Sequence, residues 1–343
     1  MSGGVDSSVA AALLLEKGYD VVGASMKLPD TFGECCGVKG IEDARRVADS
    51  LGIPFYALDC KKIFQKEVID YFCEQYRLGR TPNPCVVCND KLKFGILAAK
   101  GRALGIDFVA TGHYAGVSFD RRRNRYILRK AADKNKDQSY FLFQLSQEQL
   151  KKAVFSLADL TKSRVRSIAK KLGLKVHDKE ESQEVCFIKG DYRDFLKKRK
   201  VGFSRGNIVN SGGEILGSHE GVPFYTIGQR KLLGAHGRAV YVSGINAAKN
   251  EIVIGGEKEL FKRELTASDI NWIDREVLSR PEKFSARIRY RHREADALVR
   301  PLEDGRVGVK FSAPQRAPSP GQAIVFYRGS RVAGGGWIDE ICD

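Results

Sequence analysis

The chain has 343 residues, a length that supports two or three domains with substantial cores. Its 58 Lys and Arg residues outnumber 42 Asp and Glu residues, and the resulting net charge of +16 favours a polyanionic partner. No apolar run reaches membrane-spanning length, and Asp6 interrupts the first apolar run without a small-residue cleavage site after it. We therefore expect a cytoplasmic protein that neither crosses a membrane nor carries a secretion signal.

The first eight residues, Met-Ser-Gly-Gly-Val-Asp-Ser-Ser, form a Gly- and hydroxyl-rich turn that leads directly into the apolar run 9–15. Backbone N–H groups of Gly3 and Gly4, with the hydroxyls of Ser2, Ser7 and Ser8, predict a phosphate-binding nest at a helix N-terminus. No Lys follows the glycines, so this is not the common Lys-containing phosphate loop. An ordinary turn with a serine cap is the alternative. Because a loop of this kind normally follows a buried strand, we expect a short Val/Ile/Ala-rich run encoded upstream of Met1.

Short apolar strands alternate with helices from residue 1 to about 200. The expected strands span 19–26, 55–59 and 108–111, and the expected helices span 41–51, 63–77, 91–104, much of 147–172, and 192–200. This alternation predicts an α/β fold with a doubly wound parallel sheet. Ligands of such sheets bind beyond the carboxyl ends of the strands, where the opening loop, Met26 and residues 111–114 would converge.

After residue 200 the pattern changes to short strands separated by Gly-rich turns. Expected strands are 206–210, 213–217, 239–243 and 251–255, followed by the more regular 285–291, 296–300, 306–311 and 323–327. Period-2 strands at this spacing predict a small β-barrel or a sandwich. We therefore divide the chain into a catalytic domain (1–200), a small central β-rich domain (201–264) and a C-terminal β-barrel (265–343).

The eight cysteines of a cytosolic chain indicate thiol chemistry or metal binding rather than a disulfide framework. Cys60 and Cys73 lie in strand-like and helical patterns and are expected to be small buried hydrophobic residues. Cys342 lies in the C-terminal tail. Cys35 and Cys36 lie in a Gly-flanked loop to which we assign no role.

Cys85 and Cys88 are spaced as C-x-x-C just before a helix expected to begin near Asp90, whose dipole would favour thiolates. Cys186 lies far downstream in a strand-like context. Inert thiols or a structural zinc knuckle are the alternatives, although a zinc site wants a fourth ligand and the sequence has no second C-x-x-C.

Several motifs, in order along nearly the whole chain, resemble the tRNA-specific 2-thiouridylase family, a group of ATP pyrophosphatase-type enzymes. They are S-G-G-V-D-S (2–7), G-R-T-P-N-P (79–84) with C-N (88–89), T-G-H-Y (111–114), K-D-Q-S-Y-F (136–141), S-Q-E-V-C (182–186), T-I-G-Q-R-K (226–231), R-Y-R (289–291) and P-G-Q (320–322). The resemblance implies a pyrophosphatase-type α/β domain, a small central domain and a C-terminal β-barrel.

The resemblance also implies the chemistry. ATP with Mg²⁺ would adenylate O2 of the wobble uridine in the tRNA anticodon arm, because a uracil oxygen is a poor leaving group. Cys186 would carry a persulfide and Cys88 would be its partner, so that sulfur replaces oxygen, AMP and pyrophosphate leave, and a Cys88–Cys186 disulfide forms. A cysteine desulfurase or a sulfur-relay protein would supply the sulfur. The cofactor-binding residues would be Ser2, Gly3, Gly4, Val5, Asp6, Ser7, Met26 and Gly112. Asp6 would position a metal ion or cap the helix, and we favour the cap.

This sequence departs from the commoner family pattern at Cys85, where many members carry Asp. The substitution creates a set of three thiols, Cys85, Cys88 and Cys186. Related thiolation enzymes with such a set bind a [4Fe–4S] cluster, and thiolates are the usual ligands of these clusters. The sequence therefore leaves two sulfur routes open: cluster-bound sulfide, or the persulfide and disulfide.

By the same resemblance, Asn83, Pro84 and Cys85 would contact the target base, and the other RNA-contacting residues would be His113, Lys136, Asp137, Gln138, Arg289, Tyr290 and Gln322. Tyr290 suits stacking on a splayed loop base, although packing on the barrel is the alternative. Basic runs would add phosphate contacts: 121–125, 162–166, 197–200 and 287–293.

Two other classes remain possible from the sequence. A different ATP pyrophosphatase-type ligase would share the opening loop without needing Cys88, Cys186 or the barrel. A non-catalytic RNA-binding iron–sulfur protein would need the thiols and the basic surface but no intact nucleotide loop.

Overall fold

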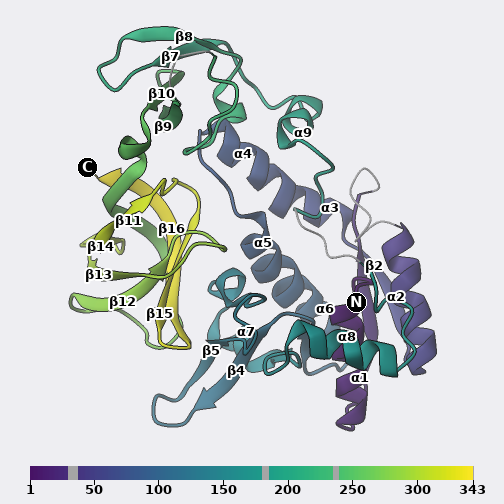
Figure 1. Ribbon diagram of the computed structural model, residues 1–343. Coiled ribbons are helices and arrows are strands. Elements are labelled where there is room, and N and C mark those ends of the chain that lie inside the picture. The colour runs from purple at the N-terminus through teal and green to yellow at the C-terminus, as the bar shows by residue number, and fades with distance from the viewer. Residues whose placement is uncertain (30–37, 180–184, 235–238, 343) are drawn as a thin grey trace. The chain divides into compact units, whose positions relative to one another are not determined.

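The structure, a computed structural model, describes residues 1–29, 38–179, 185–234 and 239–342 (Figure 1). Cys35, Cys36 and the motif residues 182–184 lie outside these ranges. The chain separates into two compact units, described here one by one. Unit 1 holds residues 1–68, 85–190 and 330–332, and unit 2 holds residues 69–84, 191–329 and 333–343.

The first part of the chain alternates helices and strands, as expected. Its elements are α1 (Val5–Glu16), β1 (Gly23–Lys27), α2 (Val38–Leu51), β2 (Phe55–Asp59), α3 (Lys61–Phe64), η1 (Gln65–Asp70), α4 (Tyr71–Arg77), α5 (Pro84–Val87), η2 (Cys88–Ile96), α6 (Leu97–Ala103), β3 (Val109–Thr111), β4 (Ala115–Asp120), β5 (Arg125–Lys130), η3 (Ser139–Leu142), α7 (Gln147–Lys152), β6 (Ala153–Phe155), α8 (Lys162–Lys171) and α9 (Tyr192–Lys198).

Unit 1 contains two parallel strand pairs, β1 with β2 and β3 with β6. α1 packs on α8 in a shared core in which Val9 and Val165 are fully buried. The prediction of an α/β fold with parallel strands is confirmed. β6 lies inside a stretch that the sequence predicts as mostly helical, because its pairing with β3 overrides the local preference.

The helix that carries the C-x-x-C motif begins earlier than expected. The prediction placed its start near Asp90, but it begins at Pro84, a residue that is favourable at a first helical position. Cys85 therefore lies in the first turn of α5, and Cys88 opens η2, a π-helix. Gly95 fits this wider turn, since a Cβ there would lie 2.9 Å from the carbonyl oxygen of Asp90, five residues earlier.

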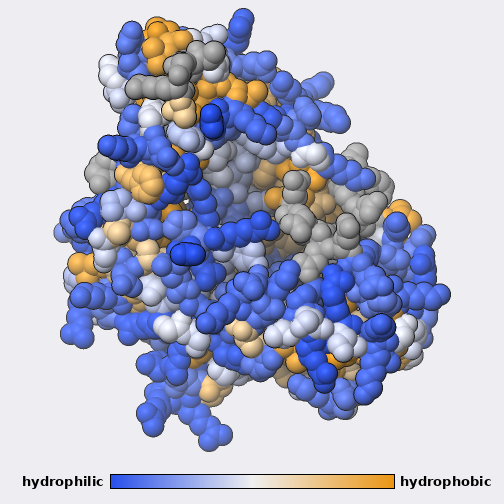
Figure 2. All heavy atoms as spheres, in the orientation of Figure 1, coloured by the Kyte–Doolittle hydropathy of each residue, from blue (hydrophilic) through white to orange (hydrophobic). Residues whose placement is uncertain are grey.

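β4 and β5 form an antiparallel hairpin that the sequence did not predict. The Asp120 carboxylate holds its end by accepting hydrogen bonds from the backbone of Arg122 and Arg123, and Arg331 at the start of β16 contacts the same carboxylate at 3.4 Å. Figure 2 shows a hydrophilic surface over this hairpin. The basic run 121–125 thus lies at the end of a well-supported hairpin.

The remaining elements belong to the β-rich part of the chain. They are β7 (Gly206–Val209), β8 (Ile215–His219), η4 (Val222–Phe224), β9 (Tyr241–Asn246), β10 (Glu251–Gly255), η5 (Glu257–Leu260), β11 (Phe261–Trp272), β12 (Glu282–Arg287), β13 (Ala295–Pro301), β14 (Val307–Arg316), β15 (Ala323–Arg328) and β16 (Arg331–Cys342).

Unit 2 contains a four-stranded sheet and a closed six-stranded barrel. The sheet has the order β8-β7-β10-β9, and the barrel has the order β11-β14-β13-β12-β15-β16 with β16 pairing back onto β11. The predicted barrel is confirmed, but both closing strands were missed. β16 has the sequence run Gly334–Gly336, which is unusual for a strand; a Cβ on Gly334 would lie 2.6 Å from the Asn271 oxygen of β11, so close approach explains the glycine.

Candidate active site

The opening loop has the geometry of an anion-binding helix N-terminus. Gly4 is the N-cap of α1 in an extended conformation, and Gly3 has a φ of +68°, which favours glycine. The Ser7 and Ser8 hydroxyls donate to the Gly4 carbonyl oxygen at 3.1 and 2.9 Å, and the Ser2 backbone N–H donates to Ser7 Oγ at 3.1 Å. The first-turn N–H groups of α1, next to this hydrogen-bonded loop, therefore suit phosphate oxygens.

Asp6 does not cap α1, contrary to the reading we favoured, because the N-cap has no side-chain hydrogen bond. Its carboxylate instead receives hydrogen bonds from Lys162 Nζ at 2.7 Å on each oxygen and from Tyr114 Oη at 2.8 Å. Lys162 is only 9% exposed. Lys162 is therefore not available for the phosphate contact that was expected of the basic run 162–166.

Gly112 lies directly against the loop. A Cβ at this position would lie 2.7 Å from both the Asp6 carbonyl carbon and the Ser7 nitrogen, so only glycine allows the two backbones to meet. Met26 lies in β1 opposite Leu58 of β2 and is half-buried. The structure thus brings Gly112 to the opening loop, as the sequence suggested.

His113 lies deep in unit 1 rather than on an open surface. It is 9% exposed, its Nδ1 hydrogen-bonds to Thr111 Oγ1 at 2.8 Å, and its ring packs near Phe94 and Phe155. Burial, and secondly the positive charge of Lys93, hold the pKa of His113 well below its usual value. His113 is therefore a neutral imidazole near neutral pH.

Asn89, directly after the C-x-x-C motif, is hydrogen-bonded to Lys93 and to the backbone of Phe141. Lys93 Nζ donates to Asn89 Oδ1 at 2.9 Å, and Asn89 Nδ2 donates to the Phe141 carbonyl oxygen at 3.0 Å. Burial raises the pKa of the Cys85 thiol, while the nearby Lys93 charge lowers it by less. The expectation that the helix dipole favours a Cys85 thiolate is therefore wrong, because burial dominates. Cys88 follows one turn later and is half-buried.

Cys186 lies in a turn rather than in the expected strand-like context. The Ile188 N–H donates to the Val185 carbonyl oxygen at 3.0 Å, which places Cys186 at a half-buried position of that turn. The next residue, Phe187, is buried against Phe64 of α3 with ring centroids 5.7 Å apart. Phe187 therefore anchors the turn that presents Cys186.

The stretch leading toward Cys186 is hydrogen-bonded to the opening loop. Lys179 Nζ donates to the Gly3 carbonyl oxygen at 3.0 Å and to Asp43 Oδ2 at 2.6 Å. Arg166 donates to the carbonyl oxygens of His177 and Lys179 at 2.7 and 3.2 Å. Lys179, which the sequence did not single out, therefore joins the loop to this stretch through its hydrogen bond to Gly3.

No group of three or more His, Cys, Asp or Glu side chains is placed to hold a metal ion within the described parts of the chain. Cys85, Cys88 and Cys186 all belong to these parts, so their expected assembly into an iron–sulfur ligand set is not supported.

Asp137 is an internal acceptor within the motif 136–141. Its carboxylate accepts hydrogen bonds from the Ala131 and Ser139 N–H groups at 3.1 and 3.2 Å and from Ser139 Oγ at 3.0 Å, and it is 4% exposed. Gln138 exchanges hydrogen bonds with Tyr114 through its backbone N–H and its side-chain oxygen. This motif therefore braces the loop that contains Gly112 and His113.

In unit 2, the segment that leads to Asn83 runs along the Pro320–Gln322 loop. The Thr81 N–H donates to the Pro320 carbonyl oxygen at 2.8 Å, and Gln322 Nε2 donates to the Pro82 carbonyl oxygen at 3.3 Å. Asn83 is 8% exposed. Two predicted RNA-binding motifs, distant in sequence, are thus brought together.

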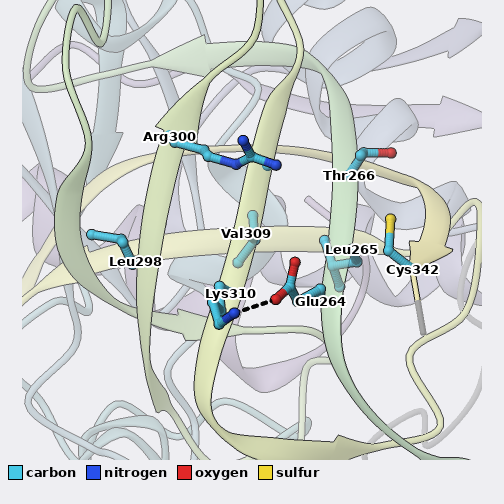
Figure 3. A pocket seen from close by; sticks show the side chains of 9 residues that line it. Glu264, Leu265, Thr266, Leu298, Arg300, Val309, Lys310 and Cys342 are labelled. Carbon is cyan, nitrogen blue, oxygen red and sulfur yellow. Dashed lines mark ion pairs between the residues drawn. The ribbon is translucent and has the colours of Figure 1, made fainter.

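Arg289 is held by the loop after β14. It donates to the Ala317 carbonyl oxygen and to Ser319 Oγ, the second at 3.2 Å. Tyr290 is half-buried next to it. A pocket on the barrel, by contrast, is lined by Glu264, Thr266, Arg300, Lys310 and Cys342 among others and includes no predicted site residue (Figure 3).

Among the described residues no helix is both long and apolar enough to cross a membrane.

Comparison with known families accounts for nearly the whole chain. The family described as tRNA methyl transferase HUP domain matches residues 1–190, the tRNA methyl transferase PRC-barrel domain matches residues 193–256, and the Aminomethyltransferase beta-barrel domain matches residues 262–338.

Three relatives that match over nearly their full length are tRNA-specific 2-thiouridylases. The chain is 49% identical to the tRNA-specific 2-thiouridylase of Acetivibrio thermocellus, with 98% of this chain and 97% of the relative covered. It is 48% identical to that of Moorella thermoacetica, covering 99% and 98%, and 47% identical to that of Clostridium botulinum (strain Eklund 17B), covering 99% and 97%. This chain therefore belongs to the tRNA-specific 2-thiouridylase family.

Proposed function

We propose that this enzyme uses ATP to replace the 2-oxygen of the wobble uridine in tRNA with sulfur, releasing AMP and pyrophosphate. The observation that carries the proposal is the Ser2–Ser8 loop at the N-terminus of α1, against which Gly112 packs without a side chain. The same unit contains Cys88 and Cys186, the two thiols that the reaction needs. The full-length relatives named above support the same activity.

In the first step, uracil O2 attacks the α-phosphorus of ATP, a P–O bond forms, and pyrophosphate leaves with the electron pair of the broken bond. The N–H groups of the loop and of the first turn of α1 would stabilise charge on the phosphate oxygens. Mg²⁺ would supply further neutralisation of the polyphosphate. Ser2, Gly3, Gly4, Val5, Asp6 and Ser7 form this cradle, with Met26 and Gly112 assigned to the adenosine side.

In the second step, the terminal sulfur of a Cys186 persulfide attacks C2, and AMP leaves with the former O2. The Cys88 thiolate then attacks Cys186 Sγ, and the bond between Cys186 Sγ and the sulfur now attached to C2 breaks. That sulfur leaves with the electron pair as 2-thiouridine, and a Cys88–Cys186 disulfide forms. A cellular dithiol must reduce this disulfide before the next cycle. A cysteine desulfurase or a sulfur-relay protein would regenerate the persulfide.

We do not route sulfur through an iron–sulfur cluster, because the three candidate thiols do not form a metal-binding group in the described residues. The donor set therefore does not fit the cluster that the sequence left open. Iron and acid-labile sulfide assays on anaerobically purified protein test this choice: an iron-free, active enzyme supports the persulfide route, and stoichiometric iron that is required for activity contradicts it.

The decisive assay supplies tRNA, ATP and a sulfur donor and then measures 2-thiouridine by nucleoside analysis. We expect thiolation by the unmodified protein and none by Cys186→Ser or Cys88→Ser. Cys342→Ser is a matched control, since Cys342 is an exposed thiol in β16 outside the proposed site. Undiminished thiolation by Cys186→Ser would overturn the sulfur route, whereas ATP turnover without any tRNA thiolation would favour a different ATP pyrophosphatase-type ligase.

For RNA binding, we propose that Asn83, Pro84 and Cys85 contact the target base, that Lys136 and Gln138 contact the anticodon arm, and that Arg289, Tyr290 and Gln322 bind tRNA from the barrel. His113, which is buried beside Phe94 and Phe155, does not meet the expectation of a direct tRNA contact, and we assign it a role in shaping this region. Because the Asp137 carboxylate is occupied internally, we assign it a shaping role and give the charged contact to Lys136. The net charge of +16 supports phosphate binding, and tRNA affinity should fall steeply as salt rises.

A tRNA substrate and cysteines that work as thiols both fit a cytoplasmic site of action, and we propose that location. We also propose a separate role for each domain. Residues 1–200 carry out the ATP and sulfur chemistry, residues 201–264 connect the two larger domains, and residues 265–343 contact tRNA.

A further inference from the structure

A partly buried charge pair joins Asp6 of the opening loop to Lys162, and the steps above give Lys162 no role. Lys162, the first residue of α8, donates from Nζ to both carboxylate oxygens of Asp6 at 2.7 Å. Tyr114 Oη donates to Asp6 Oδ1 at 2.8 Å. Both oxygens of Asp6 are therefore occupied by donors from two other segments of unit 1.

We propose that Lys162 is a positioning residue that acts as the permanent counter-ion of Asp6, so that this loop carboxylate neither ligates Mg²⁺ nor repels the phosphates of ATP. This inference rests on the proposed use of ATP by the loop. It assigns Mg²⁺ to the phosphates of ATP rather than to Asp6.

Lys162 is held in place by more than its charge. Its backbone N–H donates to Asp133 Oδ2 at 3.0 Å, and the preceding Thr161 caps α8 by accepting from the Arg164 N–H at 3.3 Å. The ammonium lies 5.8 Å from the centroid of the Tyr114 ring. α8 is itself fixed by buried Val165 and Ala169. The backbone contacts therefore fix the start of α8, and from there the Lys162 ammonium reaches both Asp6 and the Tyr114 ring.

The pair also has an electrostatic reason to exist. Asp6 lies in the first turn of α1, where the helix N-terminus attracts anions, so its own negative charge would compete with phosphate. Side-chain exposure is 11% for Lys162 and 30% for Asp6, so water screens the pair incompletely. Cancelling the Asp6 charge with a fixed cation keeps the N–H groups of the loop available to ATP.

The test measures ATP affinity, with and without Mg²⁺, for variants that remove or keep the positive charge at position 162 and for a variant that removes a lysine elsewhere on α8. We expect Lys162→Met to weaken ATP binding on the order of tenfold, because it exposes the polyphosphate to an uncompensated carboxylate. Lys162→Arg, which keeps the charge, should bind within about threefold of the unmodified protein. Lys170→Met removes an exposed lysine from the same helix and is the matched control.

The double variant Asp6→Asn/Lys162→Met decides the mechanism. If Lys162 acts by neutralising Asp6, removing both charges should restore most of the affinity lost in Lys162→Met. A double variant as weak as Lys162→Met would overturn the proposal, because Lys162 would then contact phosphate directly. A selective loss of Mg²⁺-dependent binding in Asp6→Asn alone would also overturn it, since Asp6 would then be a metal ligand.

The same variants separate this inference from the proposed function. Urea denaturation without nucleotide should show Lys162→Met destabilised and the double variant less so, which measures the pair directly. If the unmodified protein binds no ATP, the proposed function fails even when that pattern appears. If ATP binds and Lys162→Met matches Lys170→Met in both measurements, the pairing inference fails while the proposed function stands.

Discussion

Replacing Gly112 with Ala tests the contact on which the nucleotide site depends. The added Cβ would lie 2.7 Å from the Asp6 carbonyl carbon and from the Ser7 nitrogen, and 3.0 Å from Asp6 Cβ. Ordinary carbon contacts begin near 3.5 Å, so the two backbones must separate by roughly 1 Å. Two of these three neighbours are backbone atoms, which cannot turn away as a side chain can.

The expected cost follows from that displacement. Overpacking of this kind destabilises folded proteins by about 1–3 kcal/mol, and we expect about 2 kcal/mol for Gly112→Ala. A loop displaced by roughly 1 Å should also lower ATP-dependent turnover on the order of a hundredfold, since reacting groups tolerate little misplacement. The loss should exceed what the reduced folded fraction explains.

The assay combines urea denaturation with the rate of tRNA-dependent pyrophosphate release. Gly217→Ala is the control, because no atom lies within 4 Å of a Cβ built there and its φ is not positive. Gly112→Ala with unchanged stability and turnover would refute the reasoning, since the loop and Gly112 would then not be in contact.

Three further predictions follow from the same structure. His113→Gln should reduce the loss of stability in acid, because burial lowers the pKa of His113 and keeps it neutral in the folded state. The contribution of His113 to stability is retained above pH 6.5 and falls by about 1.4 kcal/mol per pH unit below it, since only the unfolded chain then takes up the proton. Denaturation at several pH values, with His292→Gln as the control, checks this. Asp137→Ala should cost about 3 kcal/mol, because buried donors of Ala131 and Ser139 lose their acceptor; an unfolding free energy unchanged from the unmodified protein would contradict it. Thr161→Ala should lower stability by about 1 kcal/mol through loss of the α8 cap, as measured by thermal unfolding, and a larger loss in ATP affinity than in stability would show that α8 positions Lys162 for the loop.

Local sequence was sufficient for the features that depend on neighbouring residues. The Ser2–Ser8 loop, the apolar run that becomes α1, and the regular alternation that becomes β13 are all encoded by residues a few positions apart. Their conformations follow from glycine, short polar side chains that hydrogen-bond locally, and period-2 burial, so the sequence was enough to predict them.

The features that the sequence left unresolved depend on contacts between distant segments. Asp6 looked like a cap until Lys162, 156 positions later, was placed on both of its oxygens. Cys85 looked like a thiolate, but in the folded chain it is partly buried and desolvation raises the pKa of its thiol. β11 and β16 became strands only because they pair with each other to close the barrel. The sequence alone indicated the family, an anion-binding geometry for the opening loop and the candidate thiols. The tertiary structure decided that the charge of Asp6 is neutralised and that the pKa of the Cys85 thiol is raised, because desolvation and pairing arise only when remote parts of the chain pack together.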